Sequence, residues 1–166
     1  IAHHPSVPDS HKSSLRLAVL NPKGSDPFLD YTNGPSPYQA GVHAPINFHA
    51  YAGATFGAFY DSAEDIVVRR NLYDAVLVLI RRRTWISLAA IKQLKEAGIR
   101  VAVAWKECGD QQIEKQLKSR RARRAYREII TLTDGILSPT SKLPPRPDQI
   151  SDEDFRSKGL LLPTPY

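Results

Sequence analysis

The sequence predicts an α/β fold, with a parallel sheet of about five strands and helices on both faces. Tyr73–Ile80 is an almost unbroken apolar run, as expected of a strand that is buried on both faces. A helical stretch over Thr84–Ala97 follows and stops at Gly98, and Ile99–Trp105 is a second apolar run, rich in valine. Two such strands joined by a helix form a parallel βαβ unit, whose crossover is almost always right-handed.

Size and composition are those of one globular domain. The chain has 166 residues, 42% of them hydrophobic, with a formal net charge of +6 and a pI of about 9.5. This charge permits an anionic partner but is too small to require nucleic acid. No apolar run reaches transmembrane length and no signal peptide opens the chain, so we expect no membrane span. The single Cys108 excludes an internal disulfide, which favours a reducing compartment and a cytoplasmic location.

The amino-terminal segment, residues 1–14, is polar and contains two prolines and three histidines. We predict a flexible arm there. Histidines without acidic or thiol neighbours do not favour a metal site, and we expect neither a metal nor a cofactor. Because the chain starts with Ile1 and contains no methionine, we also expect it to be a piece of a longer protein.

The first strand is predicted at Leu15–Leu20, and a long loop rich in proline and glycine follows it as far as Pro45. Long loops usually carry function, and this one would leave the carboxyl end of the first strand, where doubly wound folds bind ligands. The alternative is a surface loop whose tyrosines cover an edge of the core. The candidate binding residues from this segment are Asn33, Gly34, Tyr38 and His43.

Two short helices are predicted before the central βαβ unit. Pro45 would open the first, which continues through Ile46–Ala52, and Asp61–Asp65 would cap a second over Ile66–Arg70. His43 and His49 flank the start of the first helix, where an anion could bind. A pair of hydrogen-bonded histidines is the alternative.

Polar side chains also follow the two central strands. Three arginines and an indole at a strand end suit a phosphate, a carboxylate or a sugar ring, and we select Arg82 and Trp85 as candidate binding residues. In the alternative, all three arginines are solvated, an interpretation favoured for Arg81 and Arg83, and the indole packs against a neighbouring loop. Glu107, at the end of the next strand, is a candidate for binding a hydroxyl or acting as a base, against the alternative of a solvated carboxylate.

A single long helix is predicted at Gln111–Thr133. Its arginines fall on one side of the helical wheel, and the members of this set are Arg120, Arg123, Arg124 and Arg127. A solvated face is the preferred interpretation and a nucleic-acid patch the alternative, because the chain has no recognisable nucleic-acid motif. Ile136–Ser138 is the next strand, and Gly159–Leu162 the last.

This order of elements is Rossmann-like, and it resembles the amino-terminal, acceptor-side domain of GT-B fold glycosyltransferases. The resemblance rests on the first strand with its loop, on the central βαβ unit, and on three further stretches. These are Gly98-Ile99-Arg100-Val101-Ala102-Val103, Tyr126–Ser138 and Gly159-Leu160-Leu161-Leu162-Pro163. The resemblance divides the chain into residues 15–140, the acceptor-side domain, and residues 141–166, a proline-rich linker with a hinge strand.

The resemblance implies transfer of a sugar from a nucleotide-sugar donor to a hydroxyl acceptor. The donor would be held by a second domain, so we expect this chain to be inactive without it. No catalytic residue is assigned. Two alternative functions are a stand-alone Rossmann-like module that binds a nucleotide or anion, and a nucleic-acid-binding domain.

Overall fold

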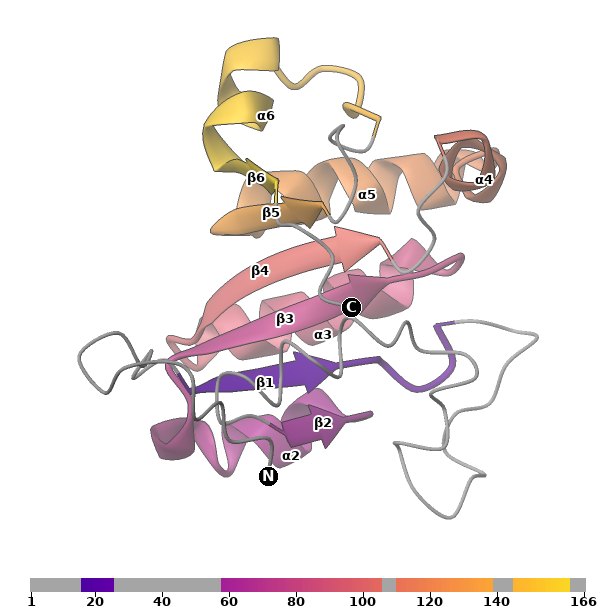
Figure 1. The fold of residues 1–166 in the computed structure, drawn as a ribbon. Helices are drawn as coiled ribbons and strands as arrows, with labels where there is room; N and C mark the ends of the chain where they lie inside the picture. The colour runs from indigo at the N-terminus through magenta and orange to yellow at the C-terminus, as the bar shows by residue number, and fades with distance from the viewer. Residues whose placement is uncertain (1–15, 26–57, 106–109, 139–144, 162–166) are drawn as a thin grey trace, which may run out of the picture.

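The computed structural model describes residues 16–25, 58–105, 110–138 and 145–161 of the chain. Six strands in this part form one parallel sheet, in the order β2-β1-β3-β4-β5-β6 (Figure 1). The strands are β1 (Leu17–Leu20), β2 (Ala58–Tyr60), β3 (Ala75–Ile80), β4 (Arg100–Trp105), β5 (Gly135–Ser138) and β6 (Gly159–Leu161). The α/β class with a parallel sheet is therefore confirmed. The sheet has one strand more than the five predicted, because the three-residue β2 was not predicted.

Helices alternate with these strands along the chain. They are α2 (Ala63–Val67), a 3₁₀ turn η4 (Arg70–Leu72), α3 (Thr84–Glu96), α4 (Asp110–Gln116), α5 (Arg120–Leu132) and α6 (Asp152–Lys158). Among the described residues, no helix has both the length and the apolar character needed to cross a membrane. The predicted helix over Ile46–Ala52 lies outside the described residues.

Strand β3 is the centre of the sheet, as its apolar run predicted. It pairs with β1 on one side and β4 on the other, so that Leu77 lies between Val19 and Ala102. From Val76 to Leu79 no side chain has any exposed surface. A strand with neighbours on both sides and both faces covered has no position for a polar side chain, which explains the uninterrupted run.

One face of the sheet carries the main core. Alternate residues of β3, such as Val76 and Val78, point to this face and pack with Ile91 and Leu94 of α3 and with Ile129 of α5. Helices α3 and α5 lie side by side on this face (Figure 1). Helices α2, α4 and α6 also contribute buried residues to the same cluster. All the described α-helices therefore contribute to one side of the sheet.

The opposite face of the sheet is also buried. Leu77 and Leu79 of β3 lie there with Val19 of β1, and none of the three side chains has exposed surface. No α-helix in the described ranges contributes to this second cluster. Helices on both faces therefore remain a prediction, although the side chains of the second face are shielded from solvent.

Helix α3 confirms the predicted helix almost residue for residue. It covers Thr84–Glu96, and Gly98 adopts the left-handed conformation two residues later, with φ of +79°. Glycine takes this conformation without the steric cost that a Cβ would bring. The chain then turns directly into β4.

The predicted long helix is wrong in one respect, because the structure has two helices. Helix α4 ends at Gln116 and α5 begins at Arg120. Ser119 caps the second helix, since its hydroxyl oxygen accepts a hydrogen bond from the Ala122 amide at 3.0 Å. A serine that bonds to the backbone in this way favours a helix start over a helix interior.

The last predicted strand joins the same sheet. Strand β6 pairs with β5 in parallel, and α6 precedes it, with Ser151 as its amino-terminal cap. Helix α6 spans the seven residues Asp152–Lys158.

Asp134 joins the ends of two core elements through its side chain. Its carboxylate accepts hydrogen bonds from the Val101 amide at 2.9 Å and from Lys95 Nζ at 2.7 Å. Partial burial alone would raise the pKa of this carboxyl group. The two hydrogen bonds and the nearby charge of Lys158 outweigh burial, so the pKa lies below its ordinary value.

We therefore expect Asp134→Ala to lower the free energy of unfolding by about 1 kcal/mol near neutral pH, a modest effect because the carboxylate is partly solvated. The folded-state pKa lies below the unfolded value, so this stabilisation is present above about pH 4 and disappears as the pH falls through the folded pKa. Urea unfolding of both proteins at neutral and at acidic pH measures this difference. A difference between the two proteins that does not shrink at acidic pH would contradict the assignment.

Candidate functional site

The strand order marks one edge of the sheet as the place for a ligand. Strands β1 and β3 are neighbours, but the chain continues from β1 to β2 on one side and from β3 to β4 on the other. Ligands of open α/β sheets bind outside the carboxyl ends of two strands related in this way. The residues there follow Leu20 of β1 and Ile80 of β3. We call the set formed by Asn21, Ser25, Arg81, Arg82 and Arg83 the switch-point cluster.

The loop after β1 is held across this edge by main-chain hydrogen bonds. The amides of Asn21 and Lys23 donate to the carbonyls of Tyr60 and Asp61, both at 2.9 Å. The Arg83 amide donates to the Ser25 carbonyl at 2.8 Å. The loop is thus tied to the end of β2 and to the start of α3.

Gly24 gives this loop its shape. Its φ is +80°, a conformation that other residues rarely adopt, and a Cβ here would stand 3.6 Å from the side chain of Ile86 in α3. The left-handed residue lies in a tight turn, closed by a hydrogen bond of 3.1 Å from the Ser25 amide to the Pro22 carbonyl. The turn sets Ser25 next to the start of α3.

Two buried polar atoms distinguish this site. Asn21 is 4% exposed and Ser25 is completely buried. Within the described residues, neither Asn21 Oδ1 nor Ser25 Oγ has a hydrogen-bond partner. Because a buried polar group without a partner costs about 1–3 kcal/mol, such groups usually serve a purpose other than stability.

The three arginines after β3 differ in exposure. Arg81 is buried, with 2% of its surface exposed, whereas Arg82 is exposed and Arg83 is intermediate. The alternative in which Arg81 is solvated is therefore wrong. Its side chain is among the largest fully buried ones of the described residues, and the residue directly follows the central strand β3. The cluster thus combines buried positive charge with an exposed arginine.

Trp85 follows the three arginines in the chain and lies in the first turn of α3. The guanidinium carbon of Arg121, in α5, sits 4.2 Å from the centre of its ring, a cation–π arrangement. The residues next to this pair also connect α3 and α5, because the Thr84 hydroxyl donates a hydrogen bond of 2.7 Å to the Ala122 carbonyl. The indole therefore belongs to the junction between α3 and α5, and its partner is a helix where the alternative predicted a loop.

The other candidate residues cannot be placed. Asn33, Gly34, Tyr38, His43 and Glu107 lie outside the described residues, as does His49. Of the predicted binding residues, only Arg82 and Trp85 are described, on either side of Arg83. Asn21 and Ser25 were not selected from the sequence. The signal that could have found them is the polar Asn-Pro-Lys-Gly-Ser stretch immediately after a buried strand.

No group of three or more histidine, cysteine or acidic side chains that could hold a metal ion occurs in the ranges that the structure describes. The donors present at the switch-point cluster are an amide, a hydroxyl and guanidinium groups. These suit hydroxyl-bearing and anionic ligands.

No protein-family model, curated protein or solved structure matches this chain.

Proposed function

We propose that the switch-point cluster binds the hydroxyl acceptor of a glycosyltransferase, and that the chain is the acceptor-side domain of such an enzyme, of the GT-B kind. The observation that carries the proposal is the pair of buried polar atoms, Asn21 Oδ1 and Ser25 Oγ, at the edge where parallel sheets bind ligands. Sugar hydroxyls both donate and accept hydrogen bonds. An amide oxygen and a hydroxyl that are already buried can therefore pair with the sugar hydroxyls without a further desolvation cost to the protein.

The arginines of the cluster would supply the positive charge that stabilises the departing phosphate groups. As the acceptor hydroxyl forms its bond to the sugar, the nucleoside diphosphate departs with the bonding electrons, and its negative charge grows. Arg82 is exposed at the same edge and would face that charge when a second domain brings the donor. The chain by itself would bind the acceptor without catalysing transfer.

The proposal includes a doubly wound fold with helices on both faces. Its support is the complete burial of Leu77 and Leu79 on the face to which none of the described helices contributes. A right-handed crossover from β1 to β2 would run on this face, because it leaves β1 in the direction opposite to the later connections. The lone cysteine and a soluble acceptor would fit a cytoplasmic protein.

The test is an NMR titration of the ¹⁵N-labelled chain with methyl glycosides of common hexoses and, separately, with a nucleoside diphosphate. We expect a glycoside to shift the amide signals of Asn21, of residues 23–25 and of residues 81–83. Ser25→Ala should weaken that binding about tenfold. It should leave the free energy of unfolding unchanged or slightly higher, since the lost hydroxyl has no partner in the described part of the fold.

Ser157→Ala is the control on α6: its exposed hydroxyl donates only to the Asp154 carbonyl, so the variant should leave glycoside binding unchanged and alter the free energy of unfolding by less than about 0.5 kcal/mol. Binding of the nucleoside diphosphate at the cluster, with no glycoside binding, would favour the alternative of a stand-alone nucleotide or anion module. A loss of stability in Ser25→Ala would instead assign the hydroxyl a structural partner.

A further inference from the structure

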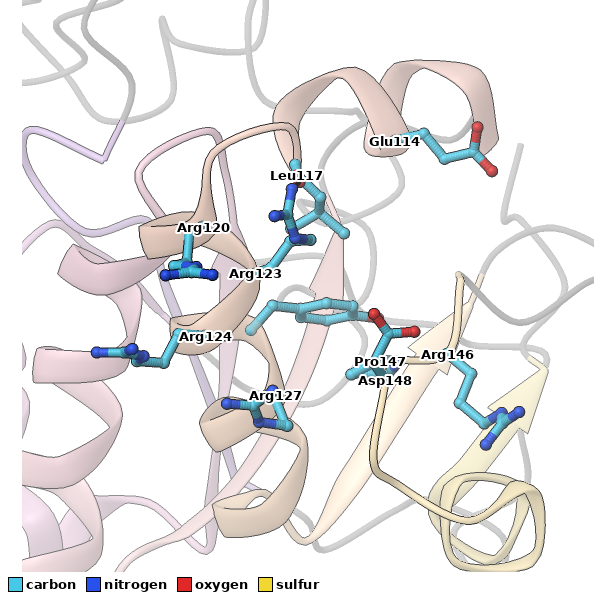
Figure 2. A pocket seen from close by; sticks show the side chains of 10 residues that line it. Glu114, Leu117, Arg120, Arg123, Arg124, Arg127, Arg146, Pro147 and Asp148 are labelled. Carbon is cyan, nitrogen blue, oxygen red and sulfur yellow. Dashed lines mark hydrogen bonds between the residues drawn. The ribbon is translucent and has the colours of Figure 1, made fainter.

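A concave site that shares no lining residue with the switch-point cluster is formed by the carboxyl-terminal half of the chain. Helices α4 and α5 and residues 146–148, which follow β5, surround a pocket of about 610 Å³ (Figure 2). We call it the arginine pocket. Its lining residues are Glu114, Leu117, Arg120, Arg123, Arg124, Tyr126, Arg127, Arg146, Pro147 and Asp148. Its volume falls within the range of about 300–1,000 Å³ that is usual for small-molecule sites.

Positive charge dominates this pocket. Four arginines come from α5, at the helical spacing of i, i+3, i+4 and i+7, and a fifth comes from the segment after β5. Among the described residues, two carboxylates, those of Glu114 and Asp148, line the same space. In Figure 2 the labelled arginines of α5 are spread along that helix, whereas the side chain of Arg146 extends away from it. The fold thus places Arg146, which is distant in sequence, in the lining of the same pocket.

Two of the five arginines are engaged with the main chain. Arg123 donates to the carbonyls of Leu117 and Lys118 between the helices, and Arg146 donates to the carbonyl of Ile150. The bonds of Arg123 join α5 to the segment that follows α4. The bond of Arg146 lies within the connection between β5 and α6. These bonds shape the pocket and leave the ligand-binding role to the other arginines.

The remaining three are Arg120, Arg124 and Arg127. Within the part of the chain that is described, none of them forms a side-chain hydrogen bond or an ion pair. Glu128, one helical turn after Arg124, is instead paired with Lys92 of α3 at 2.9 Å. Each guanidinium group carries five N–H donors in a planar fork that matches two oxygens of a phosphate. Three such groups on one helix face can serve more than one phosphoryl group.

Tyr126 makes the pocket a preformed one. Its side chain is 1% exposed, and its ring packs edge-on against that of Trp105, with 5.2 Å between the ring centres. Its hydroxyl donates a hydrogen bond of 2.9 Å to the Pro145 carbonyl. This bond fixes the 145–148 segment against α5. Burial raises the pKa of the Tyr126 hydroxyl well above its ordinary value, so the group stays neutral and adds no negative charge beneath the arginines.

We propose that the arginine pocket binds a small molecule with at least two linked phosphoryl groups, held mainly by Arg120, Arg124 and Arg127. The amino-terminal end of α5 adds the positive end of a thirteen-residue helix dipole. A nucleic-acid strand fits less well, because the aromatic ring that the described residues place in the lining, that of Tyr126, is buried and offers no surface for base stacking. This site does not depend on the function proposed for the switch-point cluster.

The test is isothermal titration calorimetry of the whole chain with inorganic tripolyphosphate, at low and at physiological salt. We expect saturable one-to-one binding that the triple variant Arg120→Gln/Arg124→Gln/Arg127→Gln weakens at least about tenfold. The matched control removes three exposed arginines elsewhere, Arg69→Gln/Arg70→Gln/Arg100→Gln, and should bind almost as the wild type does. Circular dichroism of both variants confirms that they fold.

A second arm replaces the same three pocket arginines by lysine, which keeps the charge and removes the planar fork. Weaker binding than wild type is expected there as well. Titration with a nucleoside diphosphate distinguishes the source of the phosphates. If the nucleoside diphosphate binds more tightly than tripolyphosphate, the ligand is a nucleotide. If it binds equally or more weakly, the ligand is an inorganic or other non-nucleotide phosphate chain.

Three results would overturn the proposal. They are the absence of saturable binding, an equal loss in the pocket triple and in the control triple, and a preference for single-stranded RNA over tripolyphosphate. Glycoside binding at the switch-point cluster should survive the pocket triple, so that failure of one proposal can be told from failure of the other.

Discussion

Replacing Tyr126 by alanine is expected to lower the free energy of unfolding by about 3–5 kcal/mol. The ring is almost completely buried between Trp105 and the helices, and its removal would leave a cavity that the surrounding side chains cannot fill. The hydrogen bond from the Tyr126 hydroxyl to the Pro145 carbonyl would also be lost. Urea unfolding followed by tryptophan fluorescence and by circular dichroism measures the effect.

Tyr126→Phe is the matched control for this prediction. It keeps the ring and removes only the hydroxyl that holds the 145–148 segment, so a loss of about 1 kcal/mol is expected. The phenylalanine variant should also loosen one wall of the arginine pocket without changing its charge. Equal losses in the two variants would mean that the hydroxyl, and not the buried ring, supplies the stability.

The second large effect is expected at Leu77. This side chain has no exposed surface, yet it lies on the face of the sheet to which no described α-helix contributes. If that face is covered as closely as the first, Leu77→Ala costs about 2–5 kcal/mol, the range for a leucine in a packed core. Chemical denaturation at several urea concentrations gives this free energy.

Leu94→Ala provides the reference, because Leu94 of α3 is equally buried in the core on the helix-covered face. Similar losses in the two variants would support a second packed layer and the doubly wound fold. A loss below about 1 kcal/mol at Leu77, beside a full loss at Leu94, would show that the second face is only loosely covered.

Much of the fold could be predicted from local patterns. The apolar run of β3, the glycine after α3 and the apolar run of β4 each predicted an element that the structure contains. These signals are reliable because burial on both faces excludes polar residues, and because a left-handed turn favours glycine. Strand β5 was predicted for the same reason, within one residue of its start.

The elements that were missed have weak local signals. Strand β2 has three residues, and its assignment depends on pairing with β1 through Ala58 and Phe59. The break between α4 and α5 falls in a stretch of residues that mostly form helix well, and a single capping hydroxyl at Ser119 marks it. In both places a tertiary contact or one hydrogen bond decides between structures of similar local preference.

The same contrast holds for the sites. The sequence by itself determined the parallel α/β layout around β3, and with it the edge of the sheet at which Arg82 lies. The spacing of hydrophobic residues and the positions of glycines specify strands, helices and turns within short stretches of the chain. The tertiary structure alone decided the burial of Arg81 and the position of Ser25, whose carbonyl accepts a hydrogen bond from the Arg83 amide. It also brought Arg146 to the arginines of α5. Such contacts join residues that are far apart in the chain, and no local pattern encodes them.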